Sequence, residues 1–432
     1  MDKEQTGYFM ISMVFGAMMS SAESVYVITT MLKEYGASTF ILSLIPIIGQ
    51  AGLLLSLPGA LALAKFEPKS ISIFMYSLGR VFLFFFVLVL AFPGLFAGRL
   101  VLILFLAYAF TNLIPALING ICQSWLKQVI REDVLGSLMG RRNALFAVIM
   151  GIFTPLIGIA IERHELLGVE KRLVFIWLMI FAIIMGFLDL WFLNNINGTK
   201  SLPAKQDQPA FLEIKKVARN RDLWQTANIA VMGNLGPLIL APFSILLFYE
   251  LKLNEGMVAL IIAVSTVGSA IGQVIGGHYA DQLLVRNVFL RSAFITMLGA
   301  LAILVVSVGI FSWGLNIWIA CGVLMGITIL TAAAGGAFAS ANTKYLFRAV
   351  KHSYSVAFAF INLVSGSAMF CISLCAAKIG AMLSERNEFL TTHLWPGCHY
   401  IQLVLILSMG ASLLSIWYLK RHNIYTLFHA AS

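Results

Sequence analysis

Long apolar runs recur from one end of this 432-residue chain to the other. A helix needs about 20 apolar residues to cross the hydrocarbon core of a bilayer. The runs do not alternate with a period of two, so they indicate helices rather than the strands of a membrane barrel. We predict an all-α membrane protein with twelve transmembrane helices, at 8–32, 38–64, 70–93, 99–126, 143–162, 172–195, 224–250, 256–280, 288–311, 315–343, 353–378 and 397–420.

The composition excludes soluble classes of protein. Hydrophobic residues make up 60% of the chain and charged residues only 11%. A soluble fold of this size could not bury so much apolar surface, so the exterior must be lipid. A soluble enzyme, a secreted disulfide scaffold and a nucleic-acid-binding domain are excluded, and most of the five cysteines lie in apolar runs. Residues 1–5 lack the positive start of a cleaved signal peptide.

The basic residues orient the predicted helices. The chain has 29 Lys and Arg against 19 Asp and Glu. If the N-terminus is cytoplasmic, most of these cations fall on the cytoplasmic side, as the positive-inside rule requires. We therefore expect a multi-pass membrane protein with both termini in the cytoplasm.

A basic segment at 196–223 divides the spans into two sets of six. Its apolar residues fall on one helical face, which is typical of a short amphipathic helix on an anionic membrane surface. A simple tether between two half-domains explains the segment equally well. We predict an N-terminal six-helix bundle at 1–195, a cytoplasmic linker at 196–223 and a C-terminal six-helix bundle at 224–432.

This arrangement resembles the major facilitator superfamily. Between spans 8 and 9, Gly277, Asp281 and Arg286 match the first Gly, the Asp and the last basic residue of that superfamily's G-x-x-x-D-x-x-G-R-R loop, although the second Gly is replaced by Leu284. In span 5, residues 151–158 resemble a fragment of the signature of proton-coupled exporters. The resemblance implies two pseudo-symmetric bundles that move by alternating access, with Gly277, Asp281 and Arg286 as a cytoplasmic gate. It is a resemblance to bacterial members, so it also implies a location in a bacterial inner membrane. The other interpretation of Asp281 and Arg286 is an ordinary surface charge pair.

In the superfamily, spans 1, 4, 7 and 10 line a central cavity. The resemblance therefore makes the polar residues near the middle of these spans substrate-cavity candidates, namely Asn112, Asn234, Thr328 and Thr331. Hydrogen bonding between helices is the alternative role for each of them.

Two ionisable residues lie deep within predicted spans, Glu23 in span 1 and Arg80 in span 3. Such residues are costly in a bilayer and usually functional. We predict that they couple transport to protons, with Glu23 as the carrier. The alternative is a permanent structural pair of Glu23 with Arg80. Asp189, near the inner end of span 6, is a weaker candidate because it can reach the headgroups.

Together these features predict a secondary active transporter that moves a small organic molecule, with protons and the lipid bilayer as its other partners. The span 5 fragment favours export. An uncoupled facilitator, a lipid flippase and a non-transporting sensor are the alternatives.

No phosphate-binding G-x-x-x-x-G-K-[ST] motif, nucleophile–base pair or cofactor motif occurs, so we expect no enzyme and no cofactor. His393, Cys398 and His399 lack the spacing of a metal site. We expect a monomer.

Overall fold

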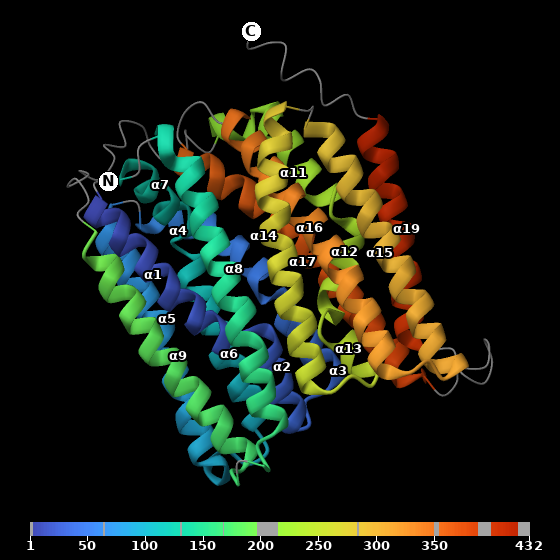
Figure 1. Cartoon of the computed structure of the whole chain (residues 1–432). Helices are drawn as coiled ribbons and strands as arrows, with labels where there is room; N and C mark the ends of the chain where they lie inside the picture. The colour runs from blue at the N-terminus through green and yellow to red at the C-terminus, as the bar shows by residue number, and fades with distance from the viewer. Residues whose placement is uncertain are drawn as a thin grey trace. The chain divides into compact units, whose positions relative to one another are not determined.

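The computed structural model describes residues 3–63, 65–129, 132–166, 168–196, 215–282, 285–349, 354–387 and 399–421 (Figure 1). This described part is helical and contains no strand. Up to residue 196 its α-helices are α1 (Lys3–Ala22), α2 (Val25–Glu34), α3 (Thr39–Leu44), α4 (Ile48–Leu63), α5 (Pro68–Ala91), α6 (Leu100–Ala116), α7 (Asn119–Val129), α8 (Glu132–Glu162) and α9 (Lys171–Asn194). Beyond it lie α11 (Arg221–Met232), α12 (Leu235–Leu240), α13 (Leu246–Glu250), α14 (Glu255–Gln282), α15 (Val285–Trp313), α16 (Ile317–Ala349), α17 (Tyr354–Glu385) and α19 (Tyr400–Arg421).

Every predicted span has a helical counterpart in this structure. Within the described residues, ten stretches are long and apolar enough to cross a membrane, and an eleventh is the bent pair Leu223–Met232 and Leu235–Phe243, whose axes differ by 57°. The shorter apolar helix Leu100–Ala116 corresponds to span 4. That span was predicted to run unbroken to residue 126, but Pro115 lies beside a break and α7 starts only at Asn119. The prediction of a twelve-helix fold is confirmed.

The chain forms two compact units. Unit 1 comprises Met1–Ala37, Ile48–Leu223 and Val350–Ser367, and unit 2 comprises Ser38–Ile47, Trp224–Ala349 and Ala368–Ser432. Within unit 1, α1 packs against α8 and α9, and α5 packs against α6 and α9 (Figure 1). Within unit 2, α16 packs against α14 and α15, and α19 packs against α12 and α15. The predicted boundaries at 195 and 224 stay a prediction, and much of the 196–223 linker lies outside the described residues.

Two spans are broken at a polar residue. In the first, α1 ends before Glu23, and the Ser24 hydroxyl caps α2 by accepting a hydrogen bond from the Val27 N–H at 3.4 Å. In the seventh, the chain turns at Asn234 between α11 and α12. Because irregular backbone at membrane depth is tolerated only where it is buried in protein or lines a cavity, both breaks mark places to look for a site.

A side-chain hydroxyl compensates for a proline near the second break. Pro242 has no N–H to donate to the carbonyl of Leu238, four residues earlier. The Ser373 hydroxyl donates to that carbonyl instead, at 2.9 Å. Tertiary contacts inside unit 2 therefore stabilise the bent segment.

Close helix packing in unit 2 depends on glycine. A Cβ atom at Gly272 of α14 would overlap the backbone of Ala333 in α16, and one at Gly336 of α16 would overlap the backbone of Ser269 in α14. Small residues allow such close approach between membrane helices. The outer surfaces instead carry large exposed side chains, including Trp313 and Trp318, which are 75% and 70% exposed at helix ends. Tryptophan is enriched at the membrane–water interface, so these positions fit a lipid-facing surface.

Candidate functional site

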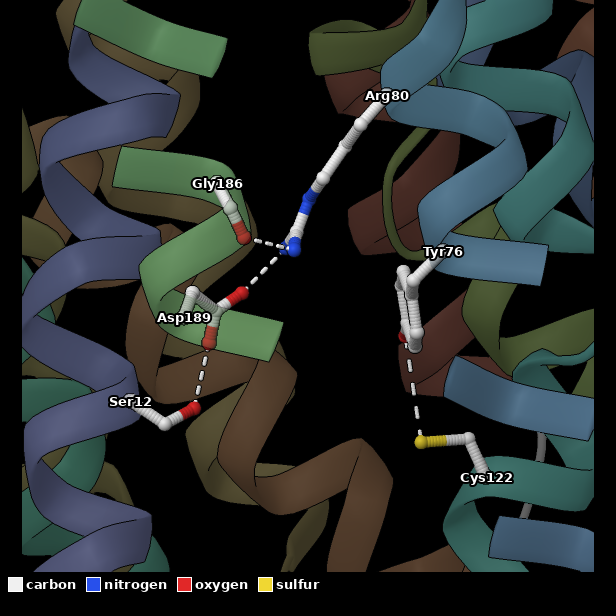
Figure 2. Close-up of polar contacts among 6 residues, drawn as sticks. All are labelled: Ser12, Tyr76, Arg80, Cys122, Gly186 and Asp189. Atoms are coloured by element: carbon white, nitrogen blue, oxygen red, sulfur yellow. Dashed lines mark hydrogen bonds and ion pairs between the residues drawn. The ribbon is translucent and has the colours of Figure 1, made fainter. Parts of the chain in front are cut away.

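An ion pair joins three helices of unit 1. The guanidinium of Arg80, on α5, donates to the carboxylate of Asp189 and to the carbonyl of Gly186, both on α9 (Figure 2). The Ser12 hydroxyl, on α1, donates to the second oxygen of Asp189. The side chains of Arg80 and Asp189 are only 6% and 15% exposed. Both oxygens of Asp189 are therefore occupied by protein donors.

This ion pair forms part of the wall of a cavity of about 320 Å³ inside unit 1. Residues from six helices, α1 and α5 to α9, surround the cavity, together with the break after α1. Its polar lining includes Glu23, Arg80, Asn112, Trp125, Arg142 and Asp189. The structure thus brings together three of the residues that the sequence selected, namely Glu23, Arg80 and Asn112.

Glu23 lies at the broken point of span 1 and lines this cavity. Its Oε2 atom is buried and has no hydrogen-bond partner in the described part of the chain. The direct pairing of Glu23 with Arg80 is not formed, because Arg80 contacts Asp189. A buried polar atom without a partner costs free energy, so Glu23 is a group that a proton or a ligand can satisfy.

Several residues that line this cavity were not predicted from the sequence. Asp189 was placed within reach of the headgroups, yet it is the counter-charge of Arg80. An arginine inside a span needs such a partner, and this was the signal that could have selected Asp189. Arg142 was counted as a charge between spans, but α8 begins at Glu132, ten residues earlier, and carries Arg142 to the cavity wall. Tyr76 and Cys122, which contact each other at 4.0 Å between oxygen and sulfur, also line the cavity (Figure 2).

Unit 2 contains a separate cavity of about 480 Å³. It is lined by the other three candidates, Asn234, Thr328 and Thr331, and by no ionisable side chain among the described residues. The hydroxyls of Thr328 and Thr331 donate to carbonyls of their own helix at 2.9 and 3.0 Å, and the Asn234 amide donates to the carbonyl of Ala230 at 2.9 Å. Each threonine hydroxyl has only one proton, so Thr328 and Thr331 can offer only acceptors to a ligand, whereas the Asn234 amide keeps a second N–H and its oxygen.

Other predicted positions fall where side chains are not described. Gly277 and Asp281 belong to α14 and Arg286 to α15, but their side chains lie outside the described residues. His393 and Cys398 also lie outside them. His399 is described, and its Nε2 atom lies 3.3 Å from the Glu250 carboxylate.

Comparison with known proteins gives the family. The sequence profile of the Major Facilitator Superfamily matches residues 8–370. The chain belongs to the major facilitator superfamily. This superfamily consists of membrane transporters, so the chain is a multi-pass membrane transporter, and the resemblance inferred from the sequence is confirmed. No curated protein matches the chain by sequence.

Solved structures of the superfamily share its fold. The crystal structure of the nucleoside transporter NupG has a TM-score of 0.66 at 12% identity and covers 97% of this chain and 100% of that one. The D-xylose-proton symporter has a TM-score of 0.67 at 11% identity, with 96% of each chain covered. A bacterial homologue of the iron transporter ferroportin, in the inward-facing state, has a TM-score of 0.64 at 13% identity, with 98% and 99% covered. At such identities the likeness shows the fold alone.

Proposed function

We propose that this protein is a secondary active transporter that moves a small organic molecule by alternating access and couples this movement to a proton. The observation that carries the proposal is the buried, unpartnered Oε2 atom of Glu23 in the unit 1 cavity. Interrupted spans at corresponding positions in two halves point to the binding site in secondary transporters. Glu23 and Asn234 lie at the interruptions of the first and seventh spans.

The contacts of Arg80 support Glu23 as the proton carrier. Burial favours the neutral form of a carboxyl group, and a bonded guanidinium favours its ionised form. Arg80 is held by Asp189 and Gly186, so its charge is offset without Glu23. Glu23 can then gain and lose a proton as the surroundings of the cavity change between states.

The proposal also includes the direction of transport, the orientation of the chain in the membrane and the position of the gate. The exporter-like fragment of span 5 favours export, and the distribution of basic residues favours cytoplasmic termini in a bacterial inner membrane. Gly277, Asp281 and Arg286 form the cytoplasmic gate. The protein works as a monomer whose two six-helix bundles move around the site.

The test is transport by the purified protein in liposomes. A thermal-shift screen first identifies a compound that stabilises the protein, because a ligand that binds the folded state raises its melting temperature. Liposomes with an imposed pH gradient should then accumulate this compound, and a protonophore should abolish the accumulation while exchange continues. Equilibration of the compound across the membrane without any pH-driven accumulation would instead favour an uncoupled facilitator or lipid flippase. A stabilising compound that is never moved would favour a sensor.

A further inference from the structure

The unit 1 cavity contains a second buried polar atom that lacks a partner. The side chain of Trp125, on α7, is 1% exposed and forms part of the cavity wall. Its Nε1 atom has no hydrogen-bond partner in the described part of the chain. An indole N–H can only donate, and leaving it buried without an acceptor costs free energy. A bound molecule that places an acceptor here would remove this cost.

Arg142, on α8, supplies a positive charge to the same wall. Its guanidinium lies 5.4 Å from the centroid of the Phe9 ring, and its Nε atom donates to the sulfur of Met13. A guanidinium can form two parallel hydrogen bonds with a carboxylate. Trp125 and Arg142 therefore both favour a ligand that carries an anionic acceptor.

The charge balance of the described lining residues depends on Glu23. Arg80 and Asp189 offset each other, and both oxygens of Asp189 are occupied. The other strongly charged lining residues are Arg142 and Glu23. The wall is therefore neutral overall when Glu23 is ionised and carries one positive charge when Glu23 is protonated. A monoanion complements the protonated form.

Aromatic rings form part of the remaining wall. Phe9, Tyr76 and Phe146 line the cavity together with Trp125. Such rings offer a large apolar surface to the body of a bound molecule. We infer that the unit 1 cavity binds the anion of a small organic acid, with its carboxylate on Trp125 and Arg142 and its apolar body against these rings.

This inference rests on the proposed function, because it assigns the proton to Glu23. Protonation of Glu23 strengthens binding of the anion, and by linkage the anion strengthens binding of the proton. The proton and the anion therefore cross the membrane in the same direction. An acid that accumulates inside the cell leaves together with a proton when its own outward gradient exceeds the inward proton gradient, and this is the condition for export.

The test compares ligands that differ only in charge. The purified full-length protein is melted at mildly acidic pH with benzoate, benzamide and benzylamine, and with hexanoate, hexanamide and hexylamine. At least one carboxylate should raise the melting temperature, and its amide and amine should not.

Trp125→Phe, which keeps a ring and removes the N–H, should weaken carboxylate binding about fivefold to tenfold. Arg142→Gln should weaken it by about tenfold or more. The lipid-facing control Trp177→Phe, at a side chain that is 65% exposed, should bind like the unaltered protein.

A measurement on the unaltered protein covers the case in which these variants do not fold. Cys122 lines the cavity and Cys371 is exposed outside it. The stabilising carboxylate should slow alkylation of Cys122 by N-ethylmaleimide, followed peptide by peptide by mass spectrometry, and should leave Cys371 unchanged. The corresponding amide should protect neither cysteine.

The outcomes separate the two proposals. Stabilisation by an amine or amide instead of a carboxylate, or by none of the carboxylates, would overturn the anion site and leave proton coupling to be judged by transport. Carboxylate binding that is equally tight at all pH values and in Glu23→Gln would support the anion site and overturn the role of Glu23.

Discussion

Arg80 donates to the carboxylate of Asp189 and leaves Glu23, in the same cavity, without an ion pair in the described part of the chain. The two carboxyl groups therefore have different roles. Asp189 offsets a buried charge and accepts from Ser12 as well, so its removal should mainly affect stability. Glu23 offsets no buried charge in the described part of the chain, so its removal should mainly affect the coupling of transport to protons.

The first prediction concerns Asp189→Asn. Removing one partner of a buried ion pair leaves the other charge uncompensated and typically costs about 3–5 kcal/mol. The variant should therefore melt at a clearly lower temperature than the unaltered protein, as measured by thermal unfolding in detergent. The double variant Arg80→Gln with Asp189→Asn should recover part of the loss, because it removes both charges. Equal melting of Asp189→Asn and the unaltered protein would show that the pair does not stabilise the fold.

The second prediction concerns Glu23→Gln. Glutamine keeps the size and hydrogen-bonding capacity of the side chain but cannot bind and release a proton. We expect loss of pH-driven accumulation with retained exchange of substrate across the membrane, both measured in liposomes. Glu165→Gln, at an exposed position outside the cavity, is the matched control and should accumulate substrate normally. Full accumulation by Glu23→Gln would eliminate Glu23 as the carrier.

The third prediction concerns topology. Reporter fusions at the C-terminus and within the 196–223 linker should be active in the cytoplasm, because the basic residues are concentrated on that side. An alkaline phosphatase fusion that is active at either place would show that the orientation is wrong.

The fourth prediction concerns Asp281→Asn. A gate residue changes the balance between inward-open and outward-open states, whereas a binding residue changes contacts with the substrate. We expect turnover to fall while substrate affinity changes no more than about threefold, because a gate residue does not contribute contacts to the bound substrate. Turnover and affinity are measured in the same liposomes. Unchanged turnover would return Asp281 to the role of a surface charge.

The sequence predicted the spans well because apolar length is itself the physical requirement for crossing a bilayer. It predicted neither the break at Glu23, which depends on the Ser24 cap, nor the end of α6 near Pro115. It also placed Arg142 outside the membrane helices, because hydropathy marks where a span is apolar and not where its helix begins.

The candidate site was likewise predicted only in part. The sequence selected Glu23, Arg80 and Asn112 as polar residues in apolar spans, and these three line one cavity. Their partners could not be derived in this way. The pairing of Arg80 with Asp189 and the buried N–H of Trp125 depend on how distant helices pack, which one sequence does not specify.

The last prediction sets helix propensity against packing at Gly186. Replacing a glycine inside a helix with alanine usually stabilises the helix by about 1 kcal/mol. At Gly186 the added Cβ would lie 2.7 Å from the sulfur of Met19 and 3.0 Å from Cδ of Arg80. Arg80 would have to move away from its partners on α9, and weakening a buried ion pair outweighs the gain in propensity. Gly186→Ala should therefore lower the melting temperature. A methyl group added at Gly410, inside α19, would meet no atom of a neighbouring element within 4 Å, so Gly410→Ala should melt at the same temperature or higher. If both substitutions raise the melting temperature equally, Arg80 does not need the space that Gly186 provides.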